Sequence, residues 1–220
     1  MGITHNLKKC NLFERKYIMA RKHIEKKKDI MSPARFFRHF SSLMVCLLIS
    51  IPFGATHAAK GVPVGNTIPA FELKTPDSPE QRQYLGLKDS ETFTLSQISS
   101  KFLLVEFYSI YCRVCQRQAP TVNKIYKFIQ DDETMRKDIK ILGIGINNNQ
   151  KEVETYRKTY GVEFPLFSDS DEEVTQKTGI KNTPLTVLID KNGKVLWSHL
   201  GLVKDADNFL REIRNIQKNH

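Results

Sequence analysis

The chain has 220 residues, of which 40% are hydrophobic, and a formal net charge of +10. This length allows one domain of ordinary size with additional segments. Residues 1–59 hold 11 of the 34 Lys and Arg residues but three of the 24 Asp and Glu residues, so residues 60–220 carry a net charge of only +2. Because the basic excess belongs to the N-terminus, the sequence gives no support for a nucleic-acid-binding domain.

Residues 1–59 have the features of a leader segment. Arginines precede an apolar stretch at 40–53, and small residues follow at 55–59. A basic region, a short apolar region and a small-residue end are typical of a secretory signal. The apolar stretch is shorter than the roughly 20 residues that span a bilayer. This length favours a signal cut after Ala58 or Ala59 over a permanent anchor or a buried core helix.

The leader hypothesis sets the domain boundary and the compartment. Residues 1–30 are too long and too charged for an ordinary leader, so we expect translation to start at Met31 and the folded domain to occupy residues 60–220. Export would place that domain in the periplasm or another extracytoplasmic space, held to the membrane by residues 40–53 if the leader stays uncut. Cleavage would leave two of the four cysteines, in a compartment whose oxidising chemistry permits a disulfide.

The part of the domain that precedes these two cysteines predicts short elements followed by one buried strand. In chain order they are a loop at 60–69, a short strand near 71–73, an exposed insertion at 75–90, a short strand at 92–95, a helical turn at 96–98 and the buried strand at 102–108.

The rest of the domain alternates helices and strands. The expected elements are a helix to about residue 131 with Pro120 near its start, a strand at 139–146, a helix at 150–160, a strand at 164–167, a helix at 171–178, strands at 185–189 and 195–199, and a helix at 205–217. Asn192-Gly193 between the last two strands predicts a hairpin. We therefore expect an α/β fold in which helices cover both faces of a central mixed sheet, with an antiparallel hairpin at one edge.

Cys112 and Cys115 form a Cys-x-x-Cys motif between the 102–108 strand and the following helix. Thiol–disulfide exchange needs both thiols, because one attacks a disulfide and the other resolves the mixed disulfide. At the start of a helix, Cys112 would face free N–H groups and the positive end of the helix dipole, which favour its thiolate. Arg113 would add a positive charge beside it. We predict that Cys112 is the nucleophile and Cys115 the resolving thiol.

A zinc site and an inert structural crosslink are the alternative interpretations of this pair. Zinc takes about four Cys, His or carboxylate ligands. From residue 60 onward, the remaining Cys and His residues are His199 and His220, which form no cluster in the sequence. We therefore expect no metal and no cofactor.

From about residue 64 to residue 216, the chain resembles the thioredoxin fold, and within it the exported TlpA/ResA-like thiol–disulfide oxidoreductases, which are grouped with the redoxins. The features that carry the resemblance are Leu104-Val105-Glu106-Phe107-Tyr108, Cys112-Arg113-Val114-Cys115, Pro120, the helix and strand within residues 147–167, Thr183-Pro184 and the hairpin at 189–193. The resemblance implies a thioredoxin-like fold with an N-terminal extension and a central insert.

The resemblance also assigns roles to residues outside the motif. In the family, the proline of the Thr-Pro pair is cis and faces the cysteines, and the neighbouring backbone pairs with a substrate strand; these roles pass to Pro184 and Thr183. Glu106 occupies the position of a buried acid beneath the disulfide. A desolvated carboxyl group there would take and return the proton of Cys115. The alternative is a partly hydrated carboxylate without a proton role.

Four positions depart from the commoner family pattern. Tyr111 replaces a tryptophan before the first cysteine, Arg113-Val114 replaces a proline-containing pair, and Gln118 replaces a glutamate three residues after the second cysteine. Gln118 weakens the case for the cytochrome c maturation branch. The residues between the cysteines tune the redox potential, so the direction of electron flow stays open. We expect Tyr111, Arg113 and Val114 to contact the substrate, with plain packing as the alternative for Tyr111.

These observations predict an exported thiol–disulfide oxidoreductase that acts on protein disulfides, as a reductase, with a membrane electron donor implied by the resemblance. A thiol peroxidase is an alternative: Ser109 fits the pattern of such enzymes, but Val105 stands where they have proline. A thiol-based metal carrier is another alternative, and it would require His199 to fold over the cysteine pair.

Overall fold

The computed structural model describes residues 61–220. The predicted leader at 1–59, with its start at Met31 and its apolar stretch at 40–53, lies outside the described residues. Within the described part of the chain, no helix has the length and apolar character needed to cross a membrane.

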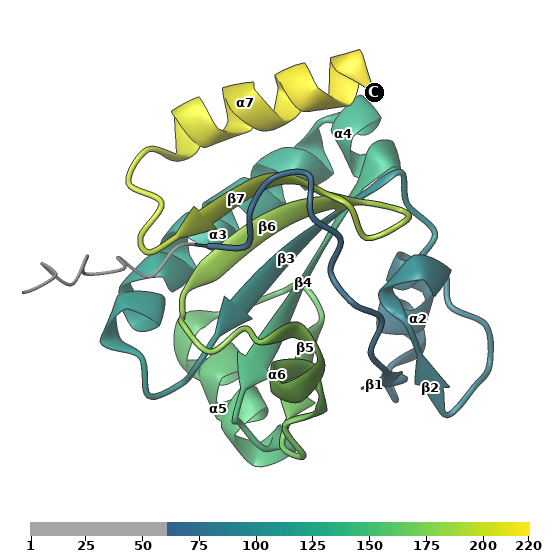
Figure 1. Cartoon of the computed structure of the whole chain (residues 1–220), viewed down its shortest axis with the longest axis vertical. Coiled ribbons are helices and arrows are strands. Elements are labelled where there is room, and N and C mark those ends of the chain that lie inside the picture. The colour runs from purple at the N-terminus through teal and green to yellow at the C-terminus, as the bar shows by residue number, and fades with distance from the viewer. Residues whose placement is uncertain (1–60) are drawn as a thin grey trace, which may run out of the picture. The chain divides into compact units, whose positions relative to one another are not determined.

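Five strands form the central sheet in the order β5-β4-β3-β6-β7 (Figure 1). They are β3 (Phe102–Tyr108), β4 (Ile139–Ile146), β5 (Leu166–Asp169), β6 (Leu185–Asp190) and β7 (Val195–Leu200). Strand β4 is parallel to both β3 and β5, whereas β6 is antiparallel to both β3 and β7. The predicted mixed sheet with an antiparallel hairpin at one edge is confirmed.

The central strand β3 is buried along its whole length. Because side chains alternate across a strand, Leu104 and Tyr108 enter one hydrophobic core while Val105 and Phe107 enter another on the opposite face. Glu106 lies between Leu104 and Tyr108 in this alternation, so its carboxyl group points into the first core.

Helices cover both faces of the sheet. The first core contains side chains of α3 (Arg113–Asp131), α4 (Glu133–Asp138), α5 (Gln150–Tyr160) and α7 (Ala206–Asn219). The second core contains side chains of α2 (Pro79–Leu85), α6 (Glu173–Thr178) and the small antiparallel sheet of β1 (Leu73–Lys74) and β2 (Thr92–Phe93); the short 3-10 helix η1 (Leu95–Gln97) follows β2. The expected α/β architecture is therefore present.

The prediction that residues 75–90 form an exposed insertion is wrong, because α2 lies within them. The Ser78 hydroxyl accepts the N–H of Gln81 and caps the helix, Pro79 is its first residue, and Gly86 ends it with φ 65°. Leu85 is fully buried in the second core. Serine and proline serve equally in loops and at helix starts, so their presence did not distinguish the two structures.

Two further differences are smaller. Helix α4 was not predicted, because Met135 is its one apolar residue and a single residue gives no helical period. Strand β5 begins at Leu166, two residues after the predicted start. The preceding residue is Pro165, which has no N–H to donate to a strand ladder.

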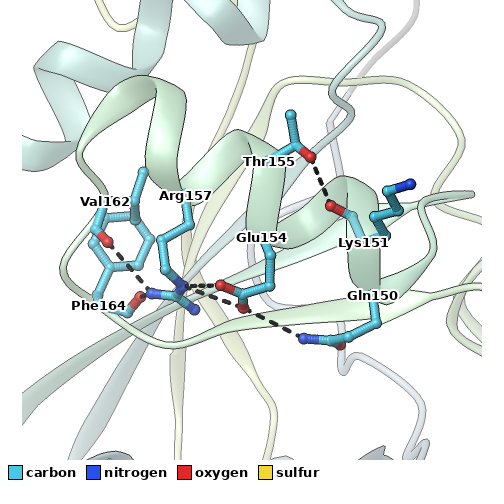
Figure 2. A network of polar contacts seen from close by, with 7 residues as sticks. All are labelled: Gln150, Lys151, Glu154, Thr155, Arg157, Val162 and Phe164. Atoms are coloured by element: carbon cyan, nitrogen blue, oxygen red, sulfur yellow. Dashed lines mark hydrogen bonds and ion pairs between the residues drawn. The ribbon is translucent and has the colours of Figure 1, made fainter.

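Arg157 fixes the C-terminal end of α5 to the segment that follows it (Figure 2). Its Nη1 donates to the carbonyl oxygens of Val162, at 3.3 Å, and Phe164, at 3.0 Å. Its Nε lies 3.4 Å from the Glu154 carboxylate. These contacts hold α5 in place as the element that presents Tyr156 to the first core.

We predict that Leu85→Ala lowers the free energy of unfolding by about 2–5 kcal/mol, because it removes a fully buried side chain and leaves a cavity. Gln83→Ala, at an exposed position of the same helix, should change it by less than about 0.5 kcal/mol. Denaturant unfolding of the two variants measures the difference. Equal stability of Leu85→Ala and the parent would contradict the burial of α2.

Candidate active site

Cys112 and Cys115 are free thiols that differ in exposure: Cys112 is half-buried and Cys115 is buried. Cys112 caps the N-terminus of α3, and its Sγ accepts the N–H of Cys115 at 3.2 Å. The same Sγ donates to the carbonyl oxygen of Thr183 at 3.4 Å. The motif therefore presents one accessible thiol, with a second thiol one helical turn behind it.

The surroundings give the two thiols opposite acidities. Burial raises the pKa of Cys112, but hydrogen bonds with the side chain and backbone of Cys115, the Thr183 side chain and the Val114 backbone together lower it below the ordinary value. Burial raises the pKa of Cys115 well above its ordinary value, and the Cys112 thiol raises it further. Arg113 is exposed to solvent and is not among the groups that lower the pKa of Cys112. Hydrogen bonds, rather than the arginine expected from the sequence, favour the thiolate.

The loop before β6 lies against the accessible thiol. The Thr183–Pro184 peptide bond is cis, as predicted, and Pro184 is buried. The Thr183 carbonyl oxygen accepts a hydrogen bond from the Cys112 Sγ, so the backbone of this loop borders the accessible sulfur.

Glu106 is a buried carboxyl group, 5% exposed. Gln118 Nε2 donates to its Oε1 at 2.7 Å, and Thr186 Oγ1 donates to its Oε2 at 2.6 Å. Burial raises the pKa of Glu106 to about 7, although both hydrogen bonds lower it. The alternative of a partly hydrated carboxylate is wrong, because the side chain is enclosed.

Gln118 and Thr186 are parts of the site to which the sequence assigned no role, although Gln118 is one of the departures from the family pattern. Gln118 is 1% exposed, and its Oε1 accepts the N–H of Val203 at 2.8 Å. Its spacing of three residues from Cys115 on a helix places the two side chains on one face. That spacing was the available signal, but the identity of its partners depends on chain segments 12 to 85 residues away.

Tyr111 lies at the surface beside the dithiol. Its ring is 72% exposed, and its hydroxyl donates to the Glu152 carboxylate at the start of α5. The ring therefore lies on the surface rather than in a hydrophobic core, and Glu152 fixes its hydroxyl group. The next residue toward the N-terminus, Ile110, donates its N–H to Oδ1 of the buried Asn148 at 2.9 Å. The segment before Cys112 is thus attached to the start of α5 at two points.

A third residue that the sequence did not indicate, Tyr156 on α5, contacts the backbone of the motif. Its hydroxyl donates to the carbonyl oxygen of Cys115 at 3.0 Å, and its ring stacks on Tyr108 with 4.3 Å between centroids. The inward-facing helical spacing of Val153 and Tyr156 was the sequence signal for this position, although it indicated only core packing.

Metal ligands do not gather around the thiols in the described part of the chain. Among residues 61–220, no group of three or more His, Cys, Asp and Glu side chains could hold a metal ion. The His199 ring contacts the carbonyl oxygen of Leu202 at 3.1 Å and stacks on Trp197. No described feature favours the metal-carrier alternative.

Solved structures with this architecture are thioredoxin-fold proteins. StoA from Bacillus subtilis is 19% identical, with a TM-score of 0.50 over 67% of this chain and 99% of that chain. The thioredoxin domain of a thiol-disulfide oxidoreductase from Bacteroides vulgatus is 18% identical, with a TM-score of 0.53 over 69% of this chain and 98% of that chain. These similarities show the fold.

Residues 63–213 match the Redoxin family, and the chain belongs to this family. The thiol-disulfide oxidoreductase ResA of Geobacillus thermodenitrificans is 29% identical over 134 residues, which are 61% of this chain and 67% of the relative. ResA of Bacillus subtilis is 23% identical over 165 residues, which are 74% of this chain and 83% of the relative. The resemblance inferred from the motifs is therefore confirmed at the level of the family.

We predict that iodoacetamide at pH 7 alkylates Cys112 at least about ten times faster than Cys115, because the thiolate is the nucleophile and the two pKa values move in opposite directions. Mass spectrometry of the reduced protein after timed quenching measures both rates. Cys112→Ser should leave Cys115 nearly unreactive. Fast alkylation of Cys115 in that variant would contradict the assignment.

Proposed function

We propose that the chain is a thiol–disulfide oxidoreductase that reduces disulfides of protein substrates through the Cys112/Cys115 couple. The opposite acidities of an accessible and a shielded thiol carry the proposal, because exchange needs a thiolate nucleophile and a protected resolving thiol. The names of the ResA relatives support the same chemistry.

The reaction begins with attack of the Cys112 thiolate on one sulfur of a substrate disulfide. A bond forms between Cys112 Sγ and that sulfur, and the other substrate sulfur leaves as a thiolate that takes up a proton. Cys115 then loses its proton and attacks Cys112 Sγ, which releases the second substrate thiol. The dithiol has then supplied two electrons and become the Cys112–Cys115 disulfide.

Glu106 is the group that takes the proton of Cys115 in the second step. Its pKa of about 7 lets the carboxyl group exist in both protonation states near neutral pH. It lies in the same core as Cys115 and is shielded from water. In the reverse direction, when the disulfide is reduced again, the protonated carboxyl group returns the proton.

The substrate binds as an extended segment beside the Thr183–Pro184 backbone, whose carbonyl oxygen already borders the nucleophile. Tyr111, Arg113 and Val114 surround the sulfur from the other side. Tyr111 supplies an exposed aromatic surface whose orientation is fixed by Glu152. Aromatic side chains that lose little freedom on binding are effective contact residues.

The enzyme acts outside the cytoplasm, directed there by the leader at 1–59, and the domain that starts near residue 60 is the working part. Each reductive cycle leaves a disulfide that must be reduced again, so we infer a membrane electron donor as the second partner. Residues 40–53 tether the domain to the membrane if the leader is retained.

We predict that Cys112→Ser lowers the reduction of a disulfide-bonded peptide by dithiothreitol at least about 100-fold, because the nucleophile is lost. Cys115→Ser should instead accumulate a mixed disulfide between Cys112 and the peptide, visible by non-reducing mass spectrometry. Full activity of Cys112→Ser would disprove the proposal. Turnover of hydrogen peroxide at the rate of disulfide reduction would replace it with peroxidase activity.

A further inference from the structure

Glu106, Gln118, Thr186 and the Val203 backbone form a network of hydrogen bonds that includes a residue of α3 three positions after Cys115. The first three side chains are each at most 5% exposed. They come from β3, α3 and β6, and the Val203 N–H comes from the segment between β7 and α7. A polar network of this kind within an apolar core must have every donor paired.

The Val203 N–H fixes the direction of the Gln118 amide. A backbone N–H can only donate, so the Gln118 atom at 2.8 Å from Val203 must be Oε1. The amide nitrogen then faces the other way, and its two hydrogens point at Glu106 Oε1, at 2.7 Å, and Thr186 Oγ1, at 3.1 Å.

This orientation also fixes the hydroxyl hydrogen of Thr186. Because Thr186 Oγ1 accepts a hydrogen from Gln118, its own hydrogen is available for Glu106 Oε2 at 2.6 Å. Each carboxylate oxygen of Glu106 therefore receives one hydrogen. Hydrogen bonds donated to a carboxylate favour its ionised form, so the network supports that form.

We propose that Gln118 and Thr186 are positioning residues that hold Glu106 ionised against its own burial, and that they thereby set the pH at which Cys115 is activated. The second part rests on the proposed function. Without the two donors, burial among Leu104, Tyr108 and the helices above them would keep the carboxyl group neutral. With them, the group changes its protonation state near neutral pH.

Other titratable groups around Glu106 do not replace this effect. Helix α3 also carries the Cys115 thiol, and α5 carries the Tyr156 hydroxyl, whose pKa is raised by burial and then by Glu106 and Cys115. Both are neutral near pH 7. On β4 the residue opposite Glu106 is Gly143, and on β6 it is Thr186. No lysine, arginine or histidine contributes to the pKa of Glu106.

The test is a direct titration of the Glu106 carboxyl carbon by NMR, in reduced protein labelled with 13C at glutamate side chains and assigned with Glu106→Gln. Thr186→Val keeps the side-chain shape but removes the donor, so the Glu106 midpoint should rise by at least one pH unit. Thr186→Ser restores the hydroxyl and should return the midpoint to the parent value. Gln118→Glu should raise it further, because two adjacent buried carboxyl groups share one proton.

A matched control is Thr175→Val. Thr175 is also buried and donates its hydroxyl to a buried carboxylate, Asp169, at 2.7 Å, but it lies outside the network. This variant should leave the Glu106 midpoint unchanged. In Thr186→Val, the pH profile of disulfide reduction should shift in the same direction as the Glu106 midpoint. In the double variant Glu106→Gln/Thr186→Val, the profile should match that of Glu106→Gln alone.

An unchanged Glu106 midpoint in both Thr186→Val and Gln118→Glu would overturn the inference, and it would leave the proposed function intact. Loss of activity in Thr186→Val at all pH values, with no shift of the profile and no recovery in Thr186→Ser, would likewise mean a purely structural role. The NMR titration does not depend on catalysis, so full activity of Cys112→Ser would refute the proposed function without affecting this result.

Discussion

The burial of one carboxyl group is the constraint on which the site depends. Glu106 stands in the middle of β3, where every other side chain on its face joins a hydrophobic core. Burying a charged or polar group without partners costs several kcal/mol. Two donors meet that cost here, and each of them belongs to an element that also carries part of the reactive surface: α3 begins at the dithiol, and β6 follows the cis-proline loop.

The buried carboxyl group and the dithiol depend on the same elements of the fold. The same helix presents Cys112 at its first turn and Gln118 in its second, so a shift of α3 would disturb the thiol and the acid together. The insert containing α5 provides the remaining supports, through Tyr156 to the Cys115 carbonyl and Glu152 to Tyr111. The Cys112 sulfur itself contacts the Thr183 carbonyl oxygen and the Cys115 N–H, and the residue stays partly exposed.

Much of the fold could be predicted because its strongest signals are local. Strands β3 and β4 match their predicted ranges, since continuous apolar runs mark strands that are buried on both faces. Helix α5 matches too, between the capping residue Asn149 and the left-handed Gly161. The segment at 75–90 was misinterpreted because a Ser-Pro helix start and a loop use the same residues.

The site was predicted only in part, for the same physical reason. A Cys-x-x-Cys pair is recognised by its spacing. Glu106 is recognised because it is an acidic residue within an apolar strand. The partners of that acid cannot be recognised in the same way. Gln118 and Thr186 are ordinary polar residues in the sequence, and the fold brings them to Glu106 across 12 and 80 residues of chain, respectively. Tyr111 was likewise undetermined, because the partner of its hydroxyl group, Glu152, is 41 residues away.

The central claim is that a buried acid with a midpoint near neutral pH is coupled to the dithiol. The most direct measurement is the reduction potential of the Cys112/Cys115 couple against glutathione from pH 5 to pH 9, in the parent and in Glu106→Gln. We predict a change of slope near pH 7 in the parent that is missing in the variant. The same pH dependence in both proteins would contradict it.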